Sequence, residues 1–349
     1  MHAWTPILLA LTALAITVLP LAVVWRAADP DKLRKLVWVC VFLTFDLIVF
    51  GAFTRLTDSG LGCPDWPGCY GLANPLLAHE QIASAQALMP TGPVTVMKAW
   101  IEMIHRFLAM TIGLLTVVLM AWAWARRRAM APLATALFLF ICLQGAFGAW
   151  TVTLKLQPVI VTTHLLLGMG LLALVTWLGV SHGRRVGERS DTDHVSAMAT
   201  LALATLFMQI ALGGWVSTNY ATLACSTFPG CGELDFAHGF TLWRELGKTA
   251  AGHYIPFAAL AAIMWVHRNF AAVVLVVVGY TAWRAWPHAP LRTLARQIAI
   301  LLALQAITGI ATIYLDFPLA IAVLHNAGAA LLVLCVTMLN YRARQKENQ

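Results

Sequence analysis

A carboxylate and an imidazole stand three residues apart in the segment Ile101-Glu102-Met103-Ile104-His105-Arg106, at the start of a long apolar run. On a helix this spacing places Glu102 and His105 on one face. Ionisable side chains at the end of a membrane helix are costly unless they have a partner or a function. The pair is therefore a candidate chemical site, and the simpler interpretation is that both side chains are hydrated among lipid headgroups.

The segment returns 162 residues later as Ile263-Met264-Trp265-Val266-His267-Arg268, with the His-Arg pair intact and methionine in place of glutamate. Methionine can neither exchange a proton nor stabilise a developing positive charge. If both segments bind the same kind of group, only the first has a residue suited to chemistry, which is Glu102.

An internal repeat relates the two halves of the chain. The matches are Gly51/Gly213, Cys63/Cys225, Pro67/Pro229, Gly68/Gly230 and Cys69/Cys231 at a shift of 162, then Leu143-Gln144/Leu304-Gln305, Gly148/Gly309 and His164/His325 at 161. A repeat of this kind indicates a duplicated structural unit. Each half contains four apolar segments, an even number, so the halves share one orientation. We predict two four-helix bundles related by a parallel repeat, with its axis along the membrane normal.

Two histidines recur in each half, near the outer ends of two different helices. His105 and His164 are 59 residues apart, and His267 and His325 are 58 apart. Two imidazoles that project inward at one level of a bundle commonly hold haem iron. A zinc site would usually add cysteine or carboxylate ligands, which these pairs do not share in both halves. We predict haem ligation by all four, against the alternative of hydrogen-bonded core histidines.

The arginines that follow two of these histidines have two interpretations. Arg106 and Arg268 could pair with haem propionates, because a guanidinium forms strong hydrogen bonds with carboxylates. They could equally contact lipid headgroups.

Two loops contain cysteine pairs with identical spacing, Cys63-Pro-Asp-Trp-Pro-Gly-Cys69 and Cys225-Ser-Thr-Phe-Pro-Gly-Cys231. Pro-Gly favours a turn in each loop. On an oxidising face of the membrane we expect one disulfide within each loop. Such a disulfide would staple the loop over the helix ends, or it would be redox-active and handle electrons.

The composition is that of a polytopic helical membrane protein, since 60% of the 349 residues are hydrophobic and 11% are charged. Apolar segments of spanning length fall at 5–25, 36–56, 104–125, 131–154, 160–180, 197–217, 267–286, 295–315 and 318–340. The first lies outside the repeat and lacks the basic start of a signal peptide, so we expect a retained extra helix that Pro20 kinks.

Charge patterning predicts the topology. Basic clusters occupy every second connection and the C-terminal tail: Lys32/Arg34/Lys35, Arg126/Arg127/Arg128, Arg184/Arg185/Arg189, Arg292/Arg296 and Arg342/Arg344/Lys346. The positive-inside rule places these in the cytoplasm and the long loops 57–103 and 218–266 on the periplasmic face. Because the net charge of +8 is divided among these clusters, it does not indicate a nucleic-acid partner.

These features resemble the haem A synthase family over about 36–340. The resemblance rests on the two four-helix halves, the combination Glu102-x-x-His105-Arg106 and the loop Gly60-Leu61-Gly62-Cys63-Pro64-Asp65-Trp66-Pro67-Gly68-Cys69-Tyr70-Gly71. It implies an inner (plasma) membrane oxidoreductase that oxidises the C8 methyl of haem O to the formyl of haem A by successive hydroxylations, for terminal oxidase biogenesis. The chain departs from the family in its extra N-terminal helix and in an apolar tail of the second outer loop, Tyr254 to Trp265.

The resemblance also implies a division of labour between the halves. His105 and His164 would flank the substrate haem O, Glu102 would act on the reacting methyl, and His267 and His325 would hold a haem b. The corresponding domains are 1–35 for the extra helix, 36–189 for the catalytic half and 190–349 for the half with the resident haem. Haem O synthase and an electron donor are expected partners, and a homo-oligomer is compatible with this arrangement.

Three other functions account for part of the pattern. A di-haem electron carrier explains four histidines but needs neither Glu102 nor any asymmetry between the halves. A quinone-linked thiol oxidase would use the loop cysteines and leave the histidines without a role. A transporter would place its paired polar residues near the bilayer midplane, whereas here they lie near the outer face.

Overall fold

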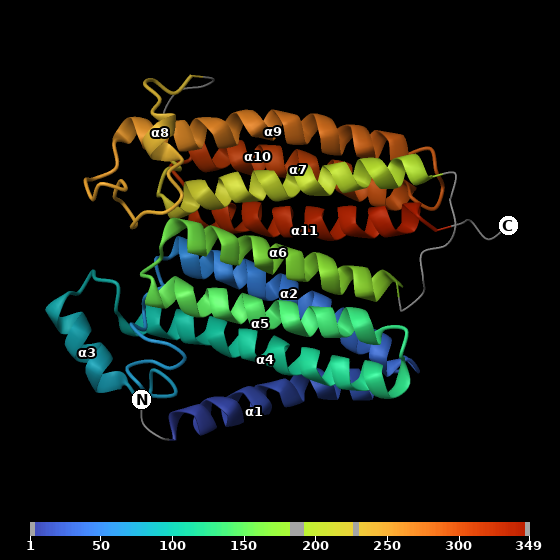
Figure 1. Cartoon of the computed structure of the whole chain (residues 1–349), viewed down its shortest axis with the longest axis horizontal. Helices are drawn as coiled ribbons and strands as arrows, with labels where there is room; N and C mark the ends of the chain where they lie inside the picture. Colours follow the sequence, from blue (N-terminus) through green and yellow to red (C-terminus); the bar gives the residue numbers. More distant parts are fainter. Residues whose placement is uncertain (1–3, 182–191, 226–229, 346–349) are drawn as a thin grey trace. The chain divides into compact units, whose positions relative to one another are not determined.

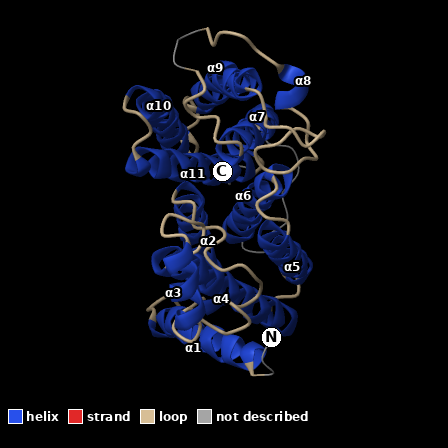
Figure 2. Ribbon diagram, turned by 90° about the vertical axis from the view of Figure 1, so that its left-hand side faces the viewer, coloured by secondary structure: helices blue, strands red, loops and turns tan. Residues whose placement is uncertain are grey.

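The computed structural model describes residues 4–181, 192–225 and 230–345, which are helical with no strand (Figure 2). Nine of the helices in these residues are long and apolar enough to cross a membrane. They are α1 (Thr5–Arg26), α2 (Lys32–Leu56), α4 (Val96–Arg126), α5 (Ala131–Thr153), α6 (Pro158–Ser181), α7 (Asp193–Thr218), α9 (Phe257–Ala285), α10 (Arg292–Tyr314) and α11 (Leu319–Ala343). This confirms the prediction of an all-α polytopic membrane protein.

Two helices begin well before the starts of the predicted apolar segments. Helix α4 begins at Val96, not near 104, and α9 begins at Phe257, not near 267. In α4 the charged side chains of Glu102 and Arg106 interrupt the apolar pattern, but they pair with each other inside the helix. Most of the segment assigned to a loop tail, Tyr254 to Trp265, consequently forms the first turns of α9.

The two long loops contain two short helices that the apolar pattern did not predict, α3 (His79–Leu88) and α8 (Phe236–Gly239). Helix α1 runs without interruption through Pro20. The basic cluster at 184, 185 and 189 lies outside the described residues.

The chain divides into two compact units, Met1–Leu156 with α1 to α5 and Gln157–Gln349 with α6 to α11. The repeat assigns α6 to the first half, whereas this division assigns it to the second unit. The predicted boundary at 189/190 lies outside the described residues. The domains inferred from the repeat therefore stay a prediction, and each unit is described below by itself.

In the first unit α4 contacts each of the other four helices (Figure 1). Helix α1 packs on it with a buried stripe at four-residue spacing, Thr5, Leu9, Ala13 and Thr17. Such spacing keeps all four side chains on one helix face. At the other end of α1, Trp25 meets Trp122 of α4 with ring centroids 5.3 Å apart.

In the second unit α7 packs against α6, α9 and α11, and α10 packs against α9 and α11. Many side chains in the core of this bundle are small; among them are Ala199, Ala202, Ala282, Ala295 and Ala343, all buried. Small residues allow helix backbones to approach closely in a membrane protein, where close packing and not the hydrophobic effect drives helix association.

Candidate functional site

The four predicted ligand histidines lie on four different helices. Each lies toward the N-terminal end of its helix. In the first unit His105 lies on α4, and in the second unit His164, His267 and His325 lie on α6, α9 and α11. His105 and His164 therefore belong to different compact units, and their pairing stays a prediction. His267 and His325 belong to the same unit and are close enough to interact electrostatically.

Glu102 is buried at the loop end of α4, with 4% of its surface exposed. Its Oε2 accepts a hydrogen bond from the Cys63 backbone N–H at 2.7 Å, and its Oε1 accepts one from Nη2 of Arg106. The two residues are four apart, so their side chains meet on one helix face. The carboxylate thus joins α4 to the first cysteine loop, one turn before His105.

Arg106 binds the same loop through three backbone carbonyls. Its Nη1 donates to the oxygens of Asp65, Pro67 and Gly68 at 2.5–3.3 Å. With Glu102 on Nη2, the guanidinium fork is occupied by protein groups. These contacts identify Arg106 as an anchor of the cysteine loop, and its pairing with a haem propionate stays a prediction.

The first cysteine loop, residues 63–69, is held tightly from within. The Asp65 carboxylate accepts the backbone N–H groups of Tyr70 and Gly71, both at 2.6 Å. Burial, and then the charge of Asp65, raise the pKa of Tyr70. A side chain at Gly68 would overlap the carbonyl of Leu72, so this turn requires glycine.

The second cysteine loop also contacts an arginine, and the position equivalent to Glu102 is Met264. Nη2 of Arg268 donates to the Cys225 carbonyl at 2.6 Å, which repeats the role of Arg106. Met264, at the position equivalent to Glu102, is 4% exposed and packs in an apolar cluster with Trp215, Cys225 and Ile263. The repeat therefore preserves the arginine anchor and omits the acid.

Both predicted cysteine pairs lie at disulfide distance. The Cα atoms of Cys63 and Cys69 are 4.9 Å apart, and those of Cys225 and Cys231 are also 4.9 Å apart. Cys63 and Cys69 are fully buried. The other cysteines, Cys40, Cys142 and Cys335, are free thiols.

Three of the predicted ligand histidines lie against glycines of a neighbouring helix. A Cβ atom on Gly51 would lie 3.0 Å from Nε2 of His105, one on Gly213 would lie 2.9 Å from Cε1 of His267, and one on Gly309 would lie 3.2 Å from Cε1 of His325. The first two contacts are equivalent in the repeat. Any larger side chain would push these imidazoles aside, which explains why the repeat keeps these glycines.

Two histidines of the second unit, His267 and His325, each have a hydrogen-bonding partner at Nδ1. Nδ1 of His325 contacts the Thr308 hydroxyl at 2.9 Å, and Nδ1 of His267 contacts the Gln209 amide at 3.2 Å. Metal-bound histidines commonly donate Nδ1–H to such a group, which leaves Nε2 for the metal. Nε2 of Gln209 also donates to the His267 carbonyl at 3.2 Å, so this amide contacts both the ring and the backbone of His267.

This arrangement fits a group with two axial imidazoles, namely a haem. Among the described residues no three His, Cys, Asp or Glu side chains gather as they would around a metal ion. The repeat marks only some of the residues that form hydrogen bonds with His267 and His325. Gln305, which donates to the His325 carbonyl at 3.0 Å, recurs as Gln144, but Gln209 and Thr308 have no counterpart in the repeat.

A further buried cation, Arg244, lies in the second outer loop and was also not predicted. It is 3% exposed, donates to the Asn219 side chain and the Lys248 carbonyl, and lies over the Trp215 ring at 5.6 Å. Burial lowers its pKa. These contacts indicate a structural anchor for the loop.

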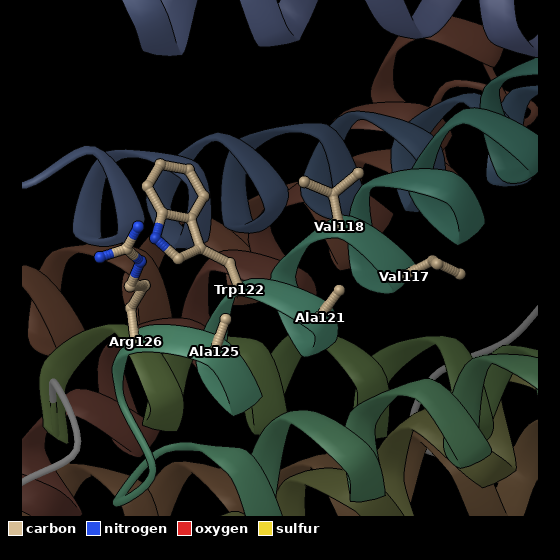
Figure 3. Close-up of a pocket in the computed structure, with 6 residues that line it drawn as sticks. All are labelled: Val117, Val118, Ala121, Trp122, Ala125 and Arg126. Carbon is tan, nitrogen blue, oxygen red and sulfur yellow. The ribbon is translucent and has the colours of Figure 1, made fainter.

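An open groove lies on the C-terminal half of α4 (Figure 3). It is lined by Val117, Val118, Ala121, Trp122, Ala125 and Arg126. Val117 is 12 residues beyond His105, which corresponds to about 18 Å along a helix. The groove is therefore too distant to form part of a site around His105.

Comparison with known proteins supports a single family. The family model described as "Cytochrome oxidase assembly protein", COX15-CtaA, matches residues 34–337, so α1 lies outside the match. A heme A synthase of Shewanella oneidensis is 39% identical over 320 residues, which cover 89% of this chain and 96% of that protein. Heme A synthases of Brucella anthropi and Nitrosospira multiformis are 27% and 28% identical and cover 91% and 88% of this chain, and 94% and 92% of their own lengths.

Proposed function

The chain belongs to the COX15-CtaA family of cytochrome oxidase assembly proteins, and we propose that it acts as a haem A synthase. It is then an oxidoreductase that converts the C8 methyl of haem O to a formyl group by successive hydroxylations. The observation that best supports this function over a di-haem carrier is the asymmetry at equivalent positions, Glu102 against Met264, in a chain that otherwise repeats its histidines and arginines.

The first half would contain the catalytic site. His105 and His164 would flank haem O, and when bound the haem supplies the redox chemistry of its iron. Glu102 lies one turn from His105, and its contacts with Arg106 and the Cys63 N–H hold its carboxylate in place. A fixed carboxylate at this position can accept a proton and stabilise positive charge that develops beside the ring.

The second half would hold a resident haem b on His267 and His325. Gln209 and Thr308 set the orientation of the two rings, as hydrogen-bonding partners of metal-bound histidines do. Met264 offers no acid or base at the equivalent of the catalytic position, which suits a haem that is retained and not modified.

The site would face the periplasm, with haem O synthase and an electron donor as partners. The basic clusters support this orientation, because those in the described residues fall at the helix ends away from the cysteine loops. A periplasmic location would also favour the disulfides of both loops.

The function is tested by producing the chain together with haem O synthase in a bacterium that lacks haem A synthase. Haems extracted from the membranes are separated and identified by mass. Haem A is expected from the parent protein. If the protein accumulates with bound haem, but only haem O and haem b are extracted, the di-haem carrier is the better interpretation.

A further inference from the structure

Helix α2 contains an acidic residue that the proposed mechanism does not use. Asp46 lies well inside this membrane-spanning helix, and among the described residues it has no hydrogen bond or ion pair. A carboxylate at such depth is costly in contact with lipid, so it faces protein, water or a ligand. Its presence therefore calls for a function.

The helix register places Asp46 on the side of α2 that contacts His105. Phe50 follows Asp46 by one turn and so lies on the same helix face. The ring of Phe50 stacks against His105, with centroids 6.4 Å apart. Asp46 precedes Gly51, the residue that contacts the His105 ring, by five positions, or about 7.5 Å along the helix away from the cysteine loops.

The repeat again replaces an acid with methionine. At the shift of 162 that relates Gly51 to Gly213, Asp46 corresponds to Met208. The equivalence is structural as well, because Gly51 and Gly213 contact equivalent histidines. The half proposed to bind haem O therefore has an acceptor for hydrogen bonds at a depth where the half proposed to bind haem b has an apolar side chain.

The two haems differ in one substituent that matches this difference. Haem O has a hydroxyl group at the root of its isoprenoid chain, where haem b has a vinyl group. This substituent is on the edge of the porphyrin opposite the propionates. Charged propionates favour the aqueous end of the bundle, so this edge lies deeper in the membrane.

We propose that Asp46 accepts a hydrogen bond from the hydroxyl group of the haem O side chain and so selects haem O over haem b at the first-half site. The assignment rests on the proposed function, since it requires haem O to bind beside His105. Asp46 is then a specificity residue that takes no part in oxidising the methyl. Met208 would instead place an apolar side chain beside the apolar vinyl group of the resident haem.

The test measures binding and not turnover. Purified full-length protein with its resident haem is titrated with haem O and, separately, with haem b, and the absorbance change gives a dissociation constant for each. The ratio of the two constants cancels effects that are common to both haems. The variants are Asp46→Met, which copies the second half, and Asp46→Asn, which keeps an oxygen acceptor. Met208→Leu is the matched control.

The parent protein is expected to prefer haem O, and Asp46→Met to reduce that preference about tenfold, the worth of one hydrogen bond to a carboxylate. Asp46→Asn and Met208→Leu should keep most of the preference for haem O. An unchanged preference in Asp46→Met, or an equal loss in Asp46→Asn, overturns the role of Asp46 and leaves the proposed function intact. A parent protein with no preference for haem O also overturns the role of Asp46, whereas a parent protein that does not bind haem O overturns the proposed function itself.

Discussion

The two cysteine loops show what the duplicated halves share and where they diverge. Arg106 and Arg268 both contact backbone carbonyls of their loop, but Arg106 is paired with Glu102, whereas the equivalent position in the second half is Met264. Since the second arginine contacts its loop with methionine at this position, anchoring alone does not explain why Glu102 is present. A buried ion pair is weak evidence for stability, because desolvation of both charges offsets much of their attraction. The comparison favours a chemical role for Glu102.

The halves also differ at a second position, where the first half again has an acid and the second has methionine. They differ further in the contacts that cover their cysteine loops. Asp46 and Glu102 correspond to Met208 and Met264, so the first half has acids where the second is apolar. The first loop also has a cover that the repeat does not supply, because Thr5 of α1 donates to the Gly71 carbonyl at 2.7 Å.

The largest predicted effect concerns the haem proposed for the second half. Replacing His267 or His325 with alanine should remove this haem, because each imidazole is proposed as one of its two iron ligands. The haem content of the purified variants is measured by absorbance and by extraction. His288→Ala, a change in the connection between α9 and α10, is the control and should keep the haem. Spectra of the His267 and His325 variants that match the parent would refute the second site.

The next largest effect is the loss of stability when either arginine anchor, Arg106 or Arg268, is replaced. Arg106→Met leaves Glu102 buried without its cation, which costs about 3–5 kcal/mol of stability. Arg268→Met removes a hydrogen bond to the Cys225 carbonyl, which costs about 1–3 kcal/mol. Thermal unfolding in detergent should therefore show the larger fall in Tm for Arg106→Met. Replacing both Glu102 and Arg106 with methionine should recover part of the loss. Equal falls for the two single variants would show that the acid does not distinguish the anchors.

The smallest effects concern the disulfides. Without reductant a thiol reagent should label Cys142, which is exposed, and reach the buried Cys40 and Cys335 only after unfolding. With graded reductant the 225–231 pair should open first, since Cys231 is partly exposed whereas Cys63 and Cys69 are fully buried. Alkylation and mass spectrometry follow both bonds. Labelling of Cys63 in unreduced protein would contradict the disulfide.

Loss of the contact between α1 and the first cysteine loop should make the 63–69 disulfide easier to reduce, and so bring it closer to the 225–231 disulfide. Thr5→Val deletes the hydrogen bond to Gly71 and should speed reduction of the 63–69 pair a few-fold, within the worth of one hydrogen bond. Thr12→Val is the control, because the Thr12 hydroxyl bonds only to the backbone of its own helix. If the two variants behave alike, α1 does not protect the loop.

The sequence predicted the membrane helices well, because a span of apolar residues is a strong signal. It failed where polar residues are satisfied inside a helix. The early start of α4 was missed because pairs such as Glu102 and Arg106 resemble a loop until their partners are known. In α9 the missed turns 257–266 are apolar, and His267 and Arg268, which lie inside the helix, separated them from the predicted span. The short helices α3 and α8 have too few apolar residues to be recognised by hydropathy.

For the site, the repeat identified the histidines, the arginines and the cysteines, since duplication marks them without any structure. It could not reveal that the Arg106 guanidinium is occupied by the loop, because backbone carbonyls have no sequence signal. Gln209 and Thr308 escaped notice for a related reason. They contact histidines that the repeat retains, but they are not themselves repeated.

The most direct test of the central claim is the haem composition of cells that produce Glu102→Gln. Glutamine can still accept the Cys63 N–H, so the loop should stay anchored and its disulfide should resist reduction as in the parent. Removing the acid should lower haem A formation at least about 100-fold, the usual worth of a positioned acid–base group.

In that experiment haem O or its hydroxylated form should accumulate while the resident haem remains, and adding Met264→Glu should not restore haem A. Normal haem A at an equal protein level in Glu102→Gln would contradict the account and favour the di-haem carrier.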